Sequence, residues 1–256
     1  MMQTIWRIGK KTFPVLLGLS LLLVIWQLIV VLGHYERTLL PAPMDVAIAL
    51  QQLIISGELW QHLRISLFRF LIGYLLATMV AIPLGIMLGR LPRLYRVIDP
   101  IVQLLRPVSP IAWSPFIVLW FGIGNIPAIV IIFLAAFFPI LLSAVAGVRQ
   151  VPEIYLKLSQ NLQLSPLAML RKIVFPAAFP HIASGLHMAV GTAWIFLVSG
   201  EMVGAQSGLG FLIIDARNMI RLDLVLAGII SIGLCGLLLD QAVRLFERMM
   251  QKRWGA

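Results

Sequence analysis

This chain of 256 residues is poor in charge, because Asp, Glu, Lys and Arg together make up 12 % of it, against about 25 % in soluble globular domains. It has one cysteine, Cys235, which excludes a disulfide within the chain and any site built from several thiolates. It also contains no G-x-x-x-x-G-K-S/T motif, so the common P-loop site is absent. We therefore expect no catalytic site, no cofactor site and no metal site on this chain.

Apolar residues take the place of charge, at 61 % of the chain and a mean hydropathy of +0.99. Five stretches contain no Asp, Glu, Lys or Arg, namely 13–33, 70–89, 107–148, 173–200 and 224–239. Because one membrane span needs about 20 such residues, the third stretch counts as two spans, with turn residues at 122–127 between them. The sequence therefore predicts an all-α polytopic membrane protein with about six transmembrane helices in a single domain, residues 1–256.

Basic residues outnumber acidic residues by 20 to 10, which gives a formal net charge of +10. Such an excess could indicate binding to nucleic acid. With six spans, however, fourteen of the twenty Lys and Arg residues fall on the side that carries both termini. Because the cytoplasmic loops of membrane proteins concentrate Lys and Arg, we expect both termini in the cytoplasm. The basic residues then face anionic lipid headgroups rather than nucleic acid.

Prolines interrupt the third predicted span at positions 107, 110 and 115. Each removes a backbone donor and clashes with the preceding turn, so this segment cannot form a regular α-helix. Carbonyl groups freed at membrane depth must face protein or a water-filled cavity. The sequence leaves two interpretations open, a kink that serves packing and a segment that lines a pathway. The pathway candidates within the segment are Ser109, Trp113 and Ser114.

A polar loop, residues 151–172, lies between two of the uncharged stretches. In it, Ile154, Leu158 and Leu162 are spaced four residues apart and share one stripe of a helix that begins after Pro152. An apolar stripe on a polar loop can bind a soluble partner, or it can pack on the underside of the membrane bundle. The sequence by itself favours neither.

A second helix is predicted in the same loop, after an interruption at 163–164. The pair Ser165–Pro166 is typical of a helix start, with a hydroxyl cap followed by proline at the first helical position. The cations at 171–172 suit the carboxyl end of a helix. We therefore expect this helix to close there, before Pro176 bends the chain into the membrane.

Several segments resemble a known family. The sequences LQLSP (162–166), IVFPAAFP (173–180) and SGL (184–186) resemble the signature cytoplasmic loop of binding-protein-dependent ABC importer permeases. The sequences RPVSPIAW (106–113), WFG (120–122) and GEMVGAQSGLG (200–210) are similar to the nitrate, sulfonate, taurine and bicarbonate group of these permeases. The resemblance extends over about residues 40–247.

The resemblance implies a type I importer fold in a bacterial cytoplasmic (inner) membrane. It implies a second copy of the permease, two cytoplasmic ATPase subunits that bind ATP and Mg, and an external substrate-binding protein. The polar loop would then be a coupling element seated on the ATPase. Its implied contact residues are Ile154, Leu158, Ser159, Leu162, Gln163, Leu164, Ser165 and Pro166.

The chain departs from the family pattern at two places in this loop. The family's Glu-Ala-Ala triplet falls on residues 157–159, which are Lys-Leu-Ser, and its glycine falls on Gln163. Replacing a glycine in a left-handed turn costs about 1 kcal/mol. The loop is therefore expected to form, and a dedicated ATPase partner is expected to match it.

Glu201 follows a 28-residue uncharged segment and precedes a glycine-rich stretch. An ionisable residue near membrane depth indicates a functional site. A carboxylate repels an anion, so we do not expect Glu201 to bind substrate. We expect it to form a hydrogen bond or an ion pair that holds the gate region, with an arginine such as Arg217 as a partner. An exposed Glu201 at the outer interface is the alternative. We expect Arg64 and Arg69 to be interfacial anchors. The family resemblance implies that the segment after Glu201 folds back toward the gate, so the implied gate region comprises Glu201, Gly208 and Gly210.

These observations predict the permease subunit of an ATP-driven importer for a small oxyanion, either an organic sulfonate such as taurine, or nitrate or bicarbonate. Arg106 could attract an anion into the pathway, or it could be an interfacial anchor. With Arg106 and Trp194 added, the pathway candidates are Arg106, Ser109, Trp113, Ser114 and Trp194. The rival class is a secondary transporter or channel, which would need intramembrane coupling carboxylates or inverted repeats.

Overall fold

The computed structural model describes residues 2–34 and 39–254, and in these two ranges every regular element is a helix. This confirms the predicted all-α class. In chain order the elements are α1 (Met2–Leu32), α2 (Pro43–Ile55), α3 (Glu58–Arg90), α4 (Pro92–Leu105), the 3₁₀ helix η1 (Pro110–Trp113), α5 (Ser114–Phe121), α6 (Asn125–Arg149), α7 (Glu153–Asn161), α8 (Pro166–Met169), the π-helical turn η2 (Leu170–Val174), α9 (Phe175–Gly204), α10 (Leu209–Asn218) and α11 (Leu222–Trp254).

Within the described residues, four helices are long and apolar enough to cross a membrane: Glu58–Arg90, Asn125–Arg149, Pro166–Gly204 and Leu222–Leu245. A fifth candidate is the pair Pro92–Leu105 and Pro110–Phe121, which is bent by 84° at the proline series. In α1 the apolar part, Leu17–Leu32, is shorter. The chain is thus a multi-pass membrane protein, and the count of six spans stays a prediction.

The described chain divides into two compact units. The first comprises residues 1–60 and 212–230, and the second comprises residues 61–211 and 231–256. In the first unit, the Trp26 indole N–H donates to the Pro41 carbonyl at 3.2 Å, and the Asp45 carboxylate accepts from the Ala42 N–H at 3.1 Å. The second unit holds most of the residues singled out from the sequence.

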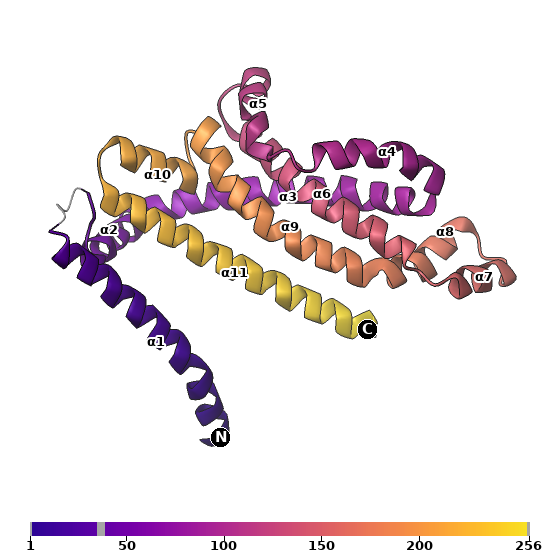
Figure 1. Cartoon of the computed structure of the whole chain (residues 1–256), viewed down its shortest axis with the longest axis horizontal. Helices are drawn as coiled ribbons and strands as arrows, with labels where there is room; N and C mark the ends of the chain where they lie inside the picture. The colour runs from indigo at the N-terminus through magenta and orange to yellow at the C-terminus, as the bar shows by residue number, and fades with distance from the viewer. Residues whose placement is uncertain (1, 35–38, 255–256) are drawn as a thin grey trace. The chain divides into compact units, whose positions relative to one another are not determined.

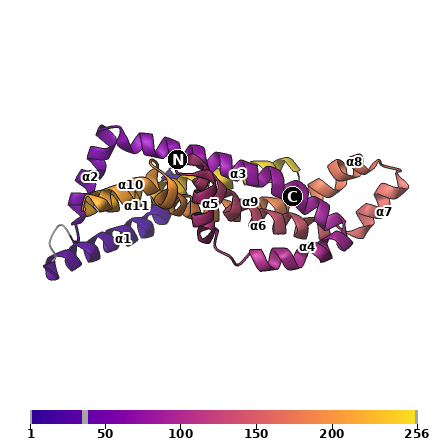
Figure 2. The same ribbon diagram turned by 90° about the horizontal axis from the view of Figure 1, so that it is seen from above.

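In the second unit, α6 packs along α9 (Figures 1 and 2). Small residues permit this close approach. A Cβ at Gly147 would lie 2.8 Å from the Ala178 carbonyl oxygen, and a Cβ at Gly185 would overlap Ser143. Because lipid tails are as apolar as the side chains, helices in a membrane associate by such close backbone packing. The pair α6 and α9 is therefore the closely packed centre of this unit.

The last helix is joined to α9 by polar contacts in the same unit. The Trp194 indole N–H donates to the Ile232 carbonyl at 3.1 Å. Further along, the two ring nitrogens of His187 lie 3.0 Å from an Asp240 oxygen and 2.9 Å from a Glu247 oxygen. These contacts fix the rotational position of this part of α11 against α9.

The predicted break at 122–127 is confirmed, since α5 ends at Phe121 and α6 begins at Asn125. Gly122 (φ +71°) and Gly124 (φ +147°) occupy the junction, in backbone conformations that favour glycine. The proline series forms the short 3₁₀ helix η1 and the start of α5 rather than a regular span. Proline rings at the first helical positions explain why these helices start where they do.

Candidate functional site

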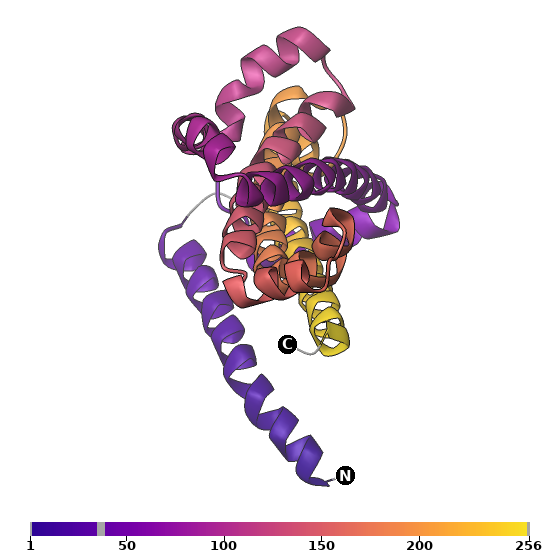
Figure 3. The same cartoon turned by 90° about the vertical axis from the view of Figure 1, so that its right-hand side faces the viewer.

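The loop between α6 and α9 lies at one end of these helices, the end seen face-on in Figure 3. Its predicted stripe points outward: the exposed fractions of Ile154, Leu158 and Leu162 are 72 %, 49 % and 61 %. Another face of α7 turns inward, where Leu156 packs against a buried cluster formed by the ends of α6 and α9. The loop is thus fastened through one face, and the stripe is not used for packing on the second unit.

Ser159, one of the expected contact residues, is buried instead of presented. Its hydroxyl donates to the Leu156 carbonyl at 2.6 Å and lies 3.0 Å from the Met169 sulfur. Met169 in turn lies 3.9 Å from the Arg90 guanidinium nitrogens. Ser159 therefore helps to hold α7 against α8, and the outward contacts of the loop come from other residues.

The second helix of the loop begins as predicted and ends differently. The Ser165 hydroxyl accepts from the Ala168 N–H at 3.3 Å, which confirms the cap. The helix does not close at 171–172, because it runs through the π-turn Leu170–Val174 into α9. The Phe175 N–H donates to the Leu170 carbonyl. The π-turn already interrupts the regular pattern of backbone hydrogen bonds at the place where Pro176 has no N–H to donate. The proline therefore does not end the helix.

Gln163 adopts φ +49°, the left-handed conformation that the family pattern assigns to glycine. The Leu164 N–H donates to the Ser159 carbonyl at 3.0 Å, which closes α7 in a Schellman arrangement. We expect Gln163→Gly to stabilise the turn by about 1 kcal/mol, because glycine adopts this φ without strain. Slower hydrogen exchange at the Leu164 amide would show this.

Gln163→Ala is the matched control for that change. Alanine keeps the Cβ and hence the strain, so exchange at Leu164 should stay close to that of the parent chain. Equal protection in the two variants would contradict the assignment of strain to Gln163.

A cavity of about 690 Å³ lies beside the proline series. Arg106 and Ser109 line it on one side. Residues of α6 and α9, including Phe138 and Met188, line the other side. Arg106 is the only Lys or Arg among the lining residues that the structure describes. Ser109, Ser143 and Thr192 add hydroxyl groups to a lining whose other side chains, apart from Arg106, are apolar, and a single cation in such a cavity attracts an anion.

The other three pathway candidates are placed differently. Trp113 lines a smaller void of about 70 Å³, which shares Val108 and Pro110 with the larger cavity. Ser114 and Trp194 are buried, and neither is among the described residues that line these two spaces. The structure thus brings Arg106 and Ser109 together at one cavity and Trp113 to a neighbouring void, and it places Trp194 in the packing between helices.

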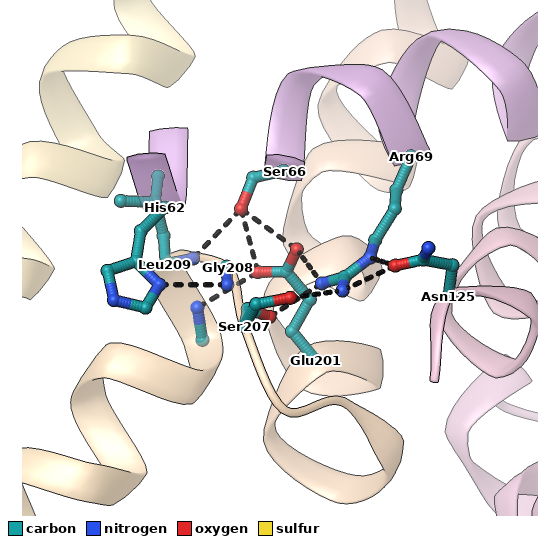
Figure 4. Close-up of polar contacts among 9 residues, drawn as sticks. His62, Ser66, Arg69, Asn125, Glu201, Ser207, Gly208 and Leu209 are labelled. Carbon is teal, nitrogen blue, oxygen red and sulfur yellow. Dashed lines mark hydrogen bonds and ion pairs between the residues drawn. The ribbon is translucent and has the colours of Figure 1, made fainter. Parts of the chain in front are cut away.

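Glu201 is fully buried, and its ion-pair partner is Arg69 at 2.8 Å (Figure 4). The expected ion pair with an arginine is confirmed, but the arginine is Arg69 and not Arg217, which lies exposed at the end of α10. Arg69 was wrongly predicted as an interfacial anchor, because its side chain is only 1 % exposed. Arg64, one turn earlier in α3, is exposed. The helical period turns one arginine outward and the other into the bundle.

The Glu201 carboxylate accepts hydrogen bonds from Arg69, from Ser66 and from Gly210. The Ser66 hydroxyl lies 2.8 and 2.9 Å from its two oxygens, and the Gly210 N–H donates at 3.0 Å. A Cβ at Gly210 would lie 2.8 Å from the Glu201 Cβ, and a Cβ at Gly208 (φ +103°) would overlap the carboxylate. The predicted set of Glu201, Gly208 and Gly210 is therefore one packed cluster, in which glycine lets the turn approach the carboxylate.

No pattern in the sequence pointed to the other members of this cluster. The Arg69 guanidinium donates to the Asn125 side-chain oxygen at 2.7 and 2.9 Å, to the Ser207 carbonyl at 2.6 Å and to the Ser207 hydroxyl at 2.7 Å. The Gly208 N–H donates to a ring nitrogen of His62 at 3.0 Å. These residues come from segments more than 50 positions apart, so no local pattern connects them.

Comparison with family models gives one description for most of this chain. The model for the binding-protein-dependent transport system inner membrane component matches residues 81–252.

Individual proteins give a consistent picture. The taurine transport system permease protein TauC of Escherichia coli is 35 % identical over 250 residues, covering 96 % of this chain and 91 % of that protein. The nitrate import permease protein NrtB of Synechocystis is 34 % identical over 251 residues, covering 94 % and 90 %. The inward-facing MetNI methionine ABC transporter matches with a TM-score of 0.56 and 21 % identity, covering 76 % of this chain and 96 % of that one. The last match shows likeness of fold.

Proposed function

Because this chain belongs to the family of binding-protein-dependent transport system inner membrane components, we propose that it imports a small oxyanion, with an organic sulfonate such as taurine as cargo. Nitrate or bicarbonate is the alternative cargo, since relatives at similar identity are named for taurine, nitrate and bicarbonate. Two copies of the chain form the pathway, with both termini in the cytoplasm of a bacterium. ATP is hydrolysed on two separate cytoplasmic subunits, and an external protein delivers the anion.

The single observation that carries the coupling role is the outward stripe on α7. An apolar row exposed on a polar loop is the kind of surface that a soluble subunit covers. The same loop is fastened to the bundle through Leu156, and Ser159 holds α7 against α8. A force applied to the stripe therefore reaches the bundle instead of bending a free loop.

One helical segment connects the loop to the cluster around Glu201 and can transmit a displacement between them. Residues 166–204 form 39 residues of helix that start in the loop and end at the Glu201 cluster. When ATP brings the two ATPase subunits together, they displace the two loops, and α9 carries the displacement along the pathway wall. The cycle works only if ATP-bound subunits stabilise one state more than the other, because equal binding to both states shifts no population.

Arg106→Gln is expected to lower ATP-dependent anion uptake into proteoliposomes by about tenfold, because it removes the cation from the cavity lining. The vesicles should hold the permease and its ATPase, with the external protein and labelled taurine, nitrate or bicarbonate outside. The wild-type arm tests the proposed function itself and selects the cargo.

Arg106→Lys is the matched control, since it keeps the charge, and it should retain most of the uptake. If Arg106→Gln transports as well as wild type, Arg106 is an interfacial anchor and not part of the pathway. If the wild-type assembly shows no ATP-dependent uptake of any of the three anions, the proposed cargo class is wrong.

A further inference from the structure

The cluster around Arg69 uses every donor of its central side chain (Figure 4). A guanidinium group has five N–H donors. In this cluster they point to Glu201, to Asn125 and to the carbonyl and hydroxyl of Ser207. Glu201 is at the end of α9, and Asn125 is the first residue of α6. One side chain of α3 thus joins two other helices and the turn that follows α9.

The backbone of the segment after α9 is also held by hydrogen bonds to side chains. Three consecutive N–H groups, at 208–210, donate to side chains of α3 and α9 at distances of 3.0, 2.8 and 3.0 Å. Ser66, Arg69 and Glu201 are each at most 1 % exposed. Separating the segment after α9 from α3 would leave several donors unpaired, and separating α9 from α3 would leave the Arg69 charge buried without its partner, so both are far costlier than keeping the groups together. These segments should therefore stay together throughout a cycle.

Two glycines, Gly122 and Gly124, connect α6, which belongs to this cluster, to the segment that lines the cavity. A Cβ at Gly122 or Gly124 would meet no atom within 4 Å, so the junction is not packed. The Gly124 N–H donates to the Gly204 carbonyl at 2.8 Å, which ties Gly124 to the end of α9. Backbone rotation at Gly122 would therefore redirect α5 without disturbing the contacts of Arg69.

The segment beyond the junction carries one wall of the cavity. Arg106 and Ser109 precede η1, and the opposite wall belongs to α6 and α9. On α5, Leu119 and Trp120 are 78 % and 68 % exposed while Ser114 and Ile117 are buried, so the helix is packed through one face and open on the other. A rotation at Gly122 would move Arg106 and Ser109 relative to the opposite wall.

We propose that Arg69 is a positioning residue that clamps adjoining parts of α3, α6 and α9 and the segment 205–210, which ends in the first residues of α10, into one block. The cavity-lining segment 106–121 moves against this block about Gly122. The proposal rests on the transport function proposed above, because a transport cycle is what requires one cavity wall to move. Arg69 sets the geometry of the block and does not contact the anion.

The first test uses the full-length permease alone, in detergent, and compares Arg69→Lys with Arg64→Lys by hydrogen exchange. Lysine keeps the charge but cannot reach Asn125, Glu201 and Ser207 at once. We expect at least tenfold faster exchange in Arg69→Lys at the amides of 208–210 and of Gly124 together. Arg64→Lys, on the exposed face of α3, should leave them unchanged. Faster exchange confined to the turn, with Gly124 unaffected, would overturn the clamp.

The second test uses wild-type permease assembled with its ATPase and external protein, nucleotide-free and trapped with ATP and vanadate. Amides of 208–210 should exchange equally slowly in both states, while peptides from 106–121 should change severalfold. Equal changes in the two regions would overturn the division into block and moving segment. Failure of wild-type uptake would contradict the transport function instead, and the first test decides the clamp independently of it.

Two glycine variants test whether the junction at Gly122 moves. Gly122→Ala strains the junction, because a residue with a Cβ disfavours φ +71°. It should lower uptake at least fivefold while the ATPase still co-purifies. Gly191→Ala, in α9, also meets open space but lies in regular helix, and it should transport normally. Equal uptake by the two variants would show that the junction does not move.

Discussion

Replacing Leu158 and Leu162 together by Asp is expected to abolish co-purification of the ATPase and ATP-dependent uptake. Both side chains are exposed on α7, at 49 % and 61 %, so the substitutions disturb little of the internal packing. Burying two leucines at an interface contributes about 3–6 kcal/mol. Their loss alone weakens binding by roughly a hundredfold or more. The two added carboxylates would also have to lose water in the groove of the partner, which weakens binding further.

The measurement is pull-down of the tagged permease in mild detergent, with the ATPase co-expressed. Lys157→Asp is the matched control: it changes the net charge by the same two units, on the same helix, but off the apolar stripe. It replaces an exposed pair with Glu153 at 3.6 Å by two like charges one helical turn apart, and each effect is worth a few tenths of a kcal/mol, about 0.5 at most. If the double variant still captures its ATPase, the stripe is not the coupling surface. If Lys157→Asp also loses it, charge and not apolar contact governs the binding.

Glu201→Ala is expected to destabilise the permease by about 3–5 kcal/mol, because it leaves the Arg69 guanidinium buried without a countercharge. The substitution also removes the acceptor for Ser66 and for the Gly210 N–H. We expect a fall in the unfolding midpoint of about 10 °C, measured by thermal unfolding in detergent with fluorescence-detected size exclusion.

Two comparisons make this result specific. Glu153→Ala removes the same carboxyl group from an exposed pair, and its midpoint should lie within about 1 °C of wild type. The double variant Arg69→Met, Glu201→Leu removes both charges and fills the volume, so it should recover a large part of the loss. A double variant no more stable than Glu201→Ala would show that hydrogen bonds to the turn, rather than the uncompensated charge, account for the destabilisation.

The fates of Arg69 and Gln163 show where prediction from sequence succeeds and where it fails. Gln163 was predicted in a left-handed turn from its place in a family motif, and φ +49° confirms it. A turn is decided within about six residues, by caps and backbone preferences that the sequence displays directly. Arg69 was predicted at the membrane surface, because a charge near the start of an apolar run usually reaches water. Its partner Glu201 lies 132 positions away, and only the packing of α3 on α9 brings them together.

The sequence by itself determined the membrane class, the break near 122–127 and the two-helix loop with its apolar stripe. Each of these follows from local hydropathy, from proline and glycine or from helical spacing, and each was found where expected. Tertiary structure decided which face of α7 is exposed, that α8 continues into α9, and which residues surround the cavity and Glu201. These depend on which helix faces meet, and that is a property of the whole packed bundle. A helical period shows that Ile154, Leu158 and Leu162 share a stripe, but only the position of Leu156 against α6 and α9 shows that the stripe faces outward.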